Sequence, residues 1–107
     1  MEIIIHRVNN LNELKNTSQK FGTEIDIRAY GSKLILSHEL FQNGECLVDY
    51  LDEYQHGTLI LNIKEAGIED DVLKFVRMRS NIKSFFLILY ASIVACKAEV
   101  PEFMATQ

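Results

Sequence analysis

The sequence predicts an α/β protein with a parallel sheet, and three observations lead to this fold class. Short apolar runs rich in Ile and Leu recur along the chain, stretches with helical apolar spacing separate them, and glycines stand at several of the boundaries. Strands that alternate with helices form units in which neighbouring strands run parallel. The order of the elements therefore favours a parallel sheet covered by helices.

Each element is predicted from its own pattern. In chain order we expect a strand at residues 2–5, a helix at 9–22, a strand at 23–30 with a return arm at 33–39, a helix at 44–57, a strand at 58–65, a helix at 68–80 and the start of a fourth strand at 82–91. Asn10 can cap the first helix because Glu13 follows three residues later, and Gly22 would end it.

A hairpin is predicted after the second strand. Gly31 and Ser32 suit a two-residue turn with glycine first, so residues whose numbers sum to 63 would face each other.

In the last predicted strand, the adjacent Phe85 and Phe86 are expected in the core.

Composition narrows the function classes. The chain has 107 residues, 48% of them apolar, which suits one domain with a real core. A net charge of −4 with scattered basic residues argues against a partner such as nucleic acid or an anionic membrane. The apolar run at residues 84–96 is shorter than the ~18 residues that suggest a membrane span.

Cysteine usage points to a reducing compartment. Cys46 and Cys96 lie fifty residues apart in apolar surroundings, without metal-ligand spacing. Two buried thiols are favoured over a disulfide, and the first residues lack the pattern of a signal peptide. A cytoplasmic location is the expectation.

Polar side chains gather on the predicted strands. The set is His6 and Arg7 at the end of the first strand, Glu24 and Asp26 on the second, and Asn62 and Lys64 on the third. Residues two apart in a strand project to the same side. Polar groups at the carboxyl ends of parallel strands are typical of a binding site in α/β proteins.

His38 belongs to the same set. The hairpin register would place His38 opposite Ile25 and within ~8 Å of Glu24 and Asp26, and a slip of one residue would place it opposite Glu24. Two carboxylates suit Mg²⁺ or Ca²⁺, and His6 with His38 would form a proton-transfer pair.

Arg7 could hold a phosphate through its planar charged group, which together with a metal and two histidines suggests hydrolysis of a phosphate ester.

The two acids also have a structural interpretation. Alternatively, Glu24 and Asp26 could pair with Arg7, Arg28 or Lys64 in a structural ion network.

Four segments together resemble the glycerophosphodiester phosphodiesterase family. They are "IIIHR", "GTEIDIR", "GSKLILSHE" and "LNIK", and the match extends over roughly residues 3–83. The resemblance implies metal-dependent hydrolysis of glycerophosphodiesters, small molecules of lipid metabolism, to glycerol phosphate and an alcohol. It also implies Mg²⁺ or Ca²⁺ as the cofactor.

The resemblance assigns roles by position. It implies that His6 and His38 are the catalytic acid and base, that Arg7 and Lys64 bind the phosphate, and that Glu24, Asp26 and Asn62 hold the metal. Asn62 stands where the family has a glutamate, which implies a weakened metal site.

The implied fold is the N-terminal half of a (β/α)8 TIM-type barrel, with about four parallel strands, three helices and a β-hairpin insertion. A complete barrel takes ~250 residues. We therefore expect a shortened, truncated member, with a partial barrel domain at residues 1–87 and a divergent tail at 88–107. The alternative is a non-catalytic fragment or an interaction module that self-associates through its open sheet edge.

Overall fold

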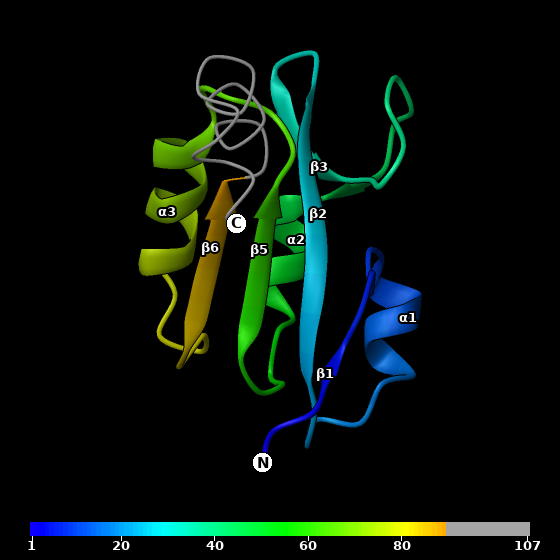
Figure 1. The fold of residues 1–107 in the computed structure, drawn as a ribbon, viewed down its shortest axis with the longest axis vertical. Coiled ribbons are helices and arrows are strands. Elements are labelled where there is room, and N and C mark those ends of the chain that lie inside the picture. The colour runs from blue at the N-terminus through cyan, green and yellow to red at the C-terminus, as the bar shows by residue number, and fades with distance from the viewer. Residues whose placement is uncertain (90–107) are drawn as a thin grey trace, which may run out of the picture.

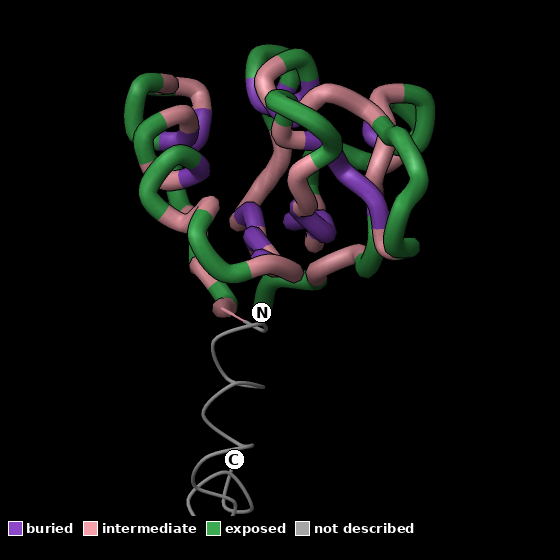
Figure 2. The backbone as a smooth tube through the Cα atoms, turned by 90° about the horizontal axis from the view of Figure 1, so that it is seen from above, coloured by how far each residue is buried: buried purple, intermediate pink, exposed green. Residues whose placement is uncertain are grey.

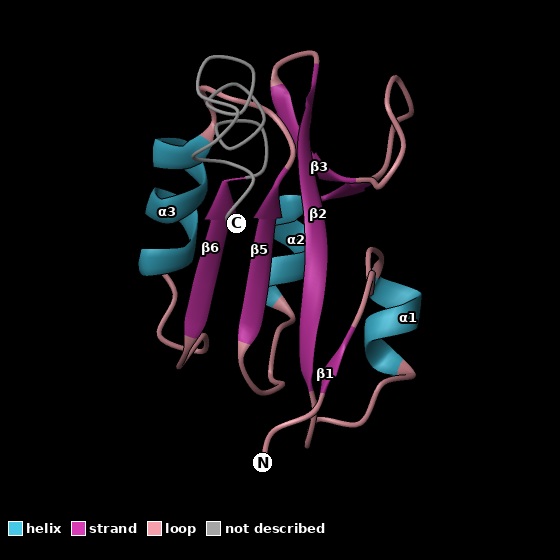
Figure 3. Ribbon diagram, viewed as in Figure 1, coloured by secondary structure: helices cyan, strands magenta, loops and turns pink. Residues whose placement is uncertain are grey.

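Strand β2 lies at the centre of the fold. The computed structural model describes residues 1–89. In chain order its elements are β1 (Ile4–Ile5), α1 (Leu11–Lys15), β2 (Gly22–Tyr30), β3 (Lys33–Leu36), β4 (Glu45–Cys46), α2 (Leu47–Asp52), β5 (Leu59–Ile63), α3 (Glu69–Arg77) and β6 (Phe85–Leu89) (Figures 1 and 3). Among these residues no helix is both long and apolar enough to cross a membrane.

The strands form one mixed sheet. Its order is β4-β3-β2-β5-β6, and β1 pairs with β2 in addition. The pairings of β1 with β2, β2 with β5 and β5 with β6 are parallel, whereas those of β2 with β3 and β3 with β4 are antiparallel. The prediction of the N-terminal half of a (β/α)8 TIM-type barrel, with four parallel strands and a hairpin set apart from them, is therefore wrong.

The length of β1 explains why the sheet is mixed. β1 pairs only with Gly22 and Thr23, at the start of the nine-residue β2. The remaining backbone groups of β2 need partners, and β3 supplies them along residues 27–30. The register of this hairpin is the predicted one, since Tyr30 faces Lys33 and Ile27 faces Leu36.

The first helix is shorter than predicted. Asn10 caps it as expected, with its side chain accepting a hydrogen bond from the backbone N–H of Glu13 at 2.8 Å. The helix ends at Lys15 because Asn16, Thr17 and Ser18 have side chains that compete for backbone hydrogen bonds. Gly22 does not end a helix. It begins β2, where a Cβ atom would collide with the backbone of Thr58.

The other two helices are also shorter than the predicted helices at 44–57 and 68–80. α2 begins at Leu47 because the preceding Glu45 and Cys46 pair with β3. α3 keeps the predicted position and carries three acidic residues in its first turn, where the helix dipole favours negative charge.

The core lies between the sheet and the helices. Ile25, Ile27, Leu61 and other alternate strand residues are buried against the apolar sides of the helices. Seen from above, the helices lie together on one side of the sheet, and the buried segments gather between the two layers (Figure 2). We call the opposite side, which these helices do not cover, the open face.

Two predictions about apolar residues are corrected. Phe86 is 62% exposed rather than in the core, because β6 alternates and only Phe85, Leu87 and Leu89 pack against the core cluster. Cys46 is a free thiol and is half-buried rather than buried. Cys96 and the predicted tail beyond Leu89 lie outside the described residues.

Candidate functional site

The predicted polar residues surround one cleft on the open face. Its volume is about 490 Å³, and its lining residues are His6, Arg7, Glu24, Asp26, His38, Asn62 and Lys64. β2 and β5 bring three of these side chains together, because Asp26 and Asn62 are register partners and Glu24 lies two residues before Asp26. The structure thus places all seven predicted site residues together, while their chemical roles stay predictions.

His6 and Glu24 form the exposed side of the cleft. Nδ1 of His6 lies 3.0 Å from Oε1 of Glu24. The imidazole is 76% exposed, whereas the glutamate is 18% exposed. This contact leaves Nε2 of His6 directed away from the carboxylate and available to a bound molecule.

Asp26 is the buried centre of the site, with 1% exposure. Its Oδ2 accepts a hydrogen bond of 3.0 Å from Nδ2 of Asn9, and its backbone N–H donates to Oδ1 of the same asparagine at 2.9 Å. Its Oδ1 lies 3.3 Å from Nδ2 of Asn62 and 3.6 Å from Nζ of Lys64. A buried carboxylate with this many donors is well compensated for its lost hydration.

His38 reaches the cleft from a loop rather than from a strand. β3 ends at Leu36, and the predicted register continues only to Ser37, whose N–H donates to the carbonyl of Asp26 at 2.9 Å. Nδ1 of His38 then lies 3.6 Å from Oδ2 of Asp26. This nitrogen is buried and has no hydrogen-bond partner, so it faces the carboxylate at a distance that a small shift would close.

Arg28 fixes this loop. Its guanidinium donates to the carbonyls of Ser37 and His38 at 3.2 and 3.1 Å. The Ser37 hydroxyl also accepts a hydrogen bond from the N–H of Glu39. The guanidinium of Arg28 therefore bonds carbonyl groups, and within residues 1–89 it forms no ion pair with Glu24 or Asp26, unlike in the structural alternative considered from the sequence.

Arg7 and Lys64 bring positive charge to the cleft. Arg7 follows β1 with φ of 55°, a left-handed conformation that is uncommon for a residue with a side chain. Such strain is often found at functional sites. Lys64 follows β5, and its side chain is 13% exposed.

The carboxylate and amide oxygens of the cleft are the type of ligand that hard divalent cations prefer. Oδ1 of Asn62 is buried without a hydrogen-bond partner, and it lies on the same sheet face as the carboxylates of Glu24 and Asp26. A carboxylate offers about four acceptor positions, so both acids keep capacity. Within residues 1–89 no group of three or more His, Cys, Asp or Glu side chains is arranged to hold a metal ion, so the amide oxygen would be needed.

Two residues take part in the site in ways that were not predicted, since Asn9 was not named and Arg28 was considered only as an ion-pair partner of the two acids. Asn9 binds both the side chain and the backbone of Asp26, and Arg28 holds the His38 loop. For Asn9 there was a signal, since it comes two residues after His6-Arg7 at the end of the first strand. For the loop contacts of Arg28 there was no signal, because the backbone carbonyls of Ser37 and His38 come within its reach only in the folded chain.

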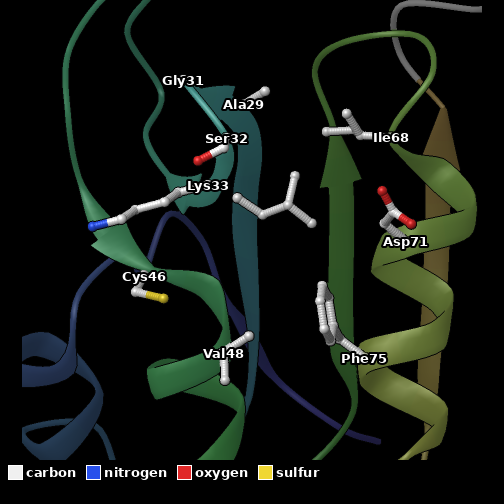
Figure 4. Close-up of a pocket in the computed structure, with 10 residues that line it drawn as sticks. Ala29, Gly31, Ser32, Lys33, Cys46, Val48, Ile68, Asp71 and Phe75 are labelled. Carbon is white, nitrogen blue, oxygen red and sulfur yellow. The ribbon is translucent and has the colours of Figure 1, made fainter.

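A second cavity lies on the helix side of the sheet. Its volume is about 460 Å³. Val48 of α2 and Phe75 of α3 flank it, with Ala29 at the end of β2 (Figure 4). None of the seven polar residues of the cleft lines this cavity, so the two spaces are separate.

Comparisons with known proteins add no relative: no family model matches the chain, and no curated protein or solved structure matches it.

Proposed function

We propose that the chain hydrolyses a phosphodiester of the glycerophosphodiester class in the cleft on the open face. The supporting observation is that two imidazoles approach the two carboxylates of one strand through their Nδ1 atoms, His6 with Glu24 and His38 with Asp26. A carboxylate at Nδ1 favours the tautomer that has its proton there. Nε2 of each ring is then the atom that meets the substrate.

In this proposal the histidines transfer protons. One imidazole takes a proton on Nε2 from water as the water oxygen attacks phosphorus. The other ring, which in this step carries a proton on both nitrogens, gives its Nε2 proton to the alcohol oxygen as the bond from that oxygen to phosphorus breaks. The products are glycerol phosphate and the alcohol. Imidazole is suited to both roles near neutral pH.

The two cations bind the substrate in this proposal. Arg7 and Lys64 both line the cleft, and their charge would stabilise the phosphoryl oxygens as negative charge develops on them. The guanidinium group can contact two of these oxygens at once.

A divalent cation is part of the proposal. Glu24, Asp26 and Asn62 would hold Mg²⁺ or Ca²⁺, together with water and substrate oxygens. When bound, the cation would polarise the phosphoryl group as a Lewis acid.

One observation favours a second candidate, a non-catalytic interaction module in which this cluster is structural. Asp26 already has an ammonium group at 3.6 Å and two amide donors. Such a network needs no substrate to be stable. This alternative gives no turnover under any metal condition.

The test is a hydrolysis assay with the purified chain. Bis(p-nitrophenyl) phosphate and a glycerophosphodiester would be offered with Mg²⁺, with Ca²⁺ and with chelator. We expect cation-dependent turnover that falls at least a hundredfold in His6→Ala and in His38→Ala, in line with the usual contribution of general acid–base groups. Turnover that persists in both variants, or is absent in the parent chain, would contradict the proposal.

His56 provides the matched control. Its ring bonds the carbonyls of Leu14 and Thr17 at 3.1 and 2.8 Å, away from the cleft. His56→Ala removes a histidine that does not line the cleft, so it leaves the residues of the proposed reaction unchanged. Its activity per folded molecule, with folding measured by circular dichroism, should equal that of the parent.

A further inference from the structure

The cavity on the helix side of the sheet, which we call the helix-side cavity, is large enough for a small molecule. Its volume of about 460 Å³ lies within the range of about 300–1,000 Å³ that is typical of ligand sites. The larger apolar side chains that line it are Leu34, Val48, Ile68 and Phe75. Each of them is half-buried, so part of its apolar surface is left for a molecule bound in the cavity.

Asp71 places a carboxylate on the α3 wall of this cavity. Ile68, Asp71 and Phe75 have the i, i+3, i+7 spacing of one helix face, and in Figure 4 the carboxylate lies between the other two side chains. None of the ion pairs among residues 1–89 includes Asp71. A few polar groups on an otherwise apolar wall are what fixes the orientation of a ligand. A cation next to an apolar group would match this wall.

Lys33 is the other charged residue that lines the helix-side cavity. In Figure 4 its ammonium group extends away from Asp71 and Phe75. Among residues 1–89 the two charged side chains form no ion pair with each other. The charge beside Phe75 is therefore negative, which favours a cationic ligand over an anionic one.

Phe75 makes an aromatic ligand the best match for the apolar part. Aromatic rings attract each other in offset or edge-to-face arrangements beyond the gain from burial alone. Asp71 and Phe75 are four residues apart on a helix, so their Cβ atoms are about 5–6 Å apart. An ammonium group on a short chain can therefore reach Asp71 while the ring of the same molecule stays against Phe75.

We propose that the helix-side cavity binds a small aromatic amine, with its ring against Phe75 and Val48 and its ammonium group at Asp71. This inference does not depend on the proposed hydrolysis, because no residue of the cleft lines the helix-side cavity. An anion held by Lys33 and an apolar molecule held by burial alone are the alternatives that the test distinguishes.

Three indole probes that differ in charge test the proposal. At neutral pH tryptamine is a cation, tryptophol is uncharged and indole-3-propionate is an anion. Each is titrated into the ¹⁵N-labelled full chain and followed through the backbone amide chemical shifts. We expect saturable shifts around Val48 and Phe75. Tryptamine should bind at least about threefold more tightly than tryptophol, the size expected for an ion pair at an exposed carboxylate, and indole-3-propionate should bind most weakly.

Asp70 provides a matched control for Asp71. Both acids lie in the first turn of α3 and both are exposed, but only Asp71 lines the cavity. Asp71→Asn should reduce the affinity for tryptamine to that for tryptophol, whereas Asp70→Asn should leave the difference between the two probes unchanged. Equal effects of the two substitutions would show that only the overall charge matters, which overturns the proposal.

Other results of the titrations would also overturn it. If no probe gives saturable shifts, the cavity is not a ligand site. Equal affinities for tryptamine and tryptophol would indicate an apolar site without a role for Asp71, and tightest binding of indole-3-propionate would indicate an anion at Lys33. If the shifts caused by tryptamine centre on Glu24 and Asp26, the amine binds in the cleft instead.

Discussion

Asn62 donates a hydrogen bond to Asp26 at 3.3 Å, across a register pair of two parallel strands, while its own Oδ1 is buried without a partner. The pair thus joins a carboxylate that has several donors to an amide oxygen that has none. Buried polar atoms without partners are rare in folded proteins. In the proposed function, this oxygen would be one of the ligands of the divalent cation.

If the cleft binds a divalent cation as proposed, introducing a carboxylate at position 62 should strengthen that binding. In Asn62→Asp, without divalent ions, two negative charges would face each other across the parallel pair and lower stability, since like charges directly opposite are unfavourable. Added Mg²⁺ or Ca²⁺ should then raise the melting temperature more than it does in the parent. Thermal scans with and without the ions measure this. Equal shifts in Asn62→Asp and in Asn62→Ala would argue against a cation at this position.

Removing the carboxylate of Asp26 should destabilise the fold. Asp26→Ala leaves Lys64 and the amides of Asn9 and Asn62 without their shared acceptor, and breaking such a buried pair costs about 3 kcal/mol. Asp26→Asn keeps an acceptor and the volume, so its cost should be about 1–2 kcal/mol. Urea titrations give both values. A loss below about 0.5 kcal/mol in the alanine variant, the range of ordinary surface substitutions, would contradict the role of Asp26 as the buried centre.

Asn9 should matter for stability although it lies in a loop. Asn9→Ala removes one hydrogen bond to the Asp26 carboxylate and another to its backbone N–H, for a loss of about 1–3 kcal/mol. Asn12→Ala is the matched control, because Asn12 is an exposed position in the first helix where alanine is a better helix former. If both variants unfold at the same urea concentration, the contacts of Asn9 contribute nothing.

Alkaline pH should unfold the protein through its buried tyrosines. Burial raises the pKa of Tyr50 and of Tyr54, whose hydroxyls meet Thr23 and the carbonyl of Gly57. Because these pKa values are higher in the folded state, their contribution is fully present below the unfolded value of about 10 and is lost as pH rises above it.

Tyr50→Phe removes one of these two groups. We expect the variant to be less stable than the parent at pH 8, because the contact of 3.0 Å with Thr23 is lost. The decrease in its free energy of unfolding above about pH 10 should however be smaller than in the parent. Urea titrations at pH 8 and above pH 10 separate the two effects, and parallel pH curves would show that Tyr50 does not contribute.

The sequence by itself determined the local elements and much of the site. Alternation in residues 23–30 and 58–65 placed Glu24, Asp26 and Asn62 on one face of the sheet. The Asn10 cap and the register of the hairpin are also as predicted. All three features depend on residues that are close together in the sequence. Such features follow from short-range periodicity and turn chemistry.

Only the tertiary structure decided which strands pair along the edges of β2, and therefore that the sheet is mixed. β1 is too short to cover β2, so β3 pairs with the rest of that edge, and β4 extends the sheet beyond β3. The same long-range pairing placed His38 on a loop held by Arg28, joined Asn9 to Asp26 and turned Phe86 away from the core. Backbone groups and buried charges must find partners across the whole fold, and no local pattern states which partners remain available.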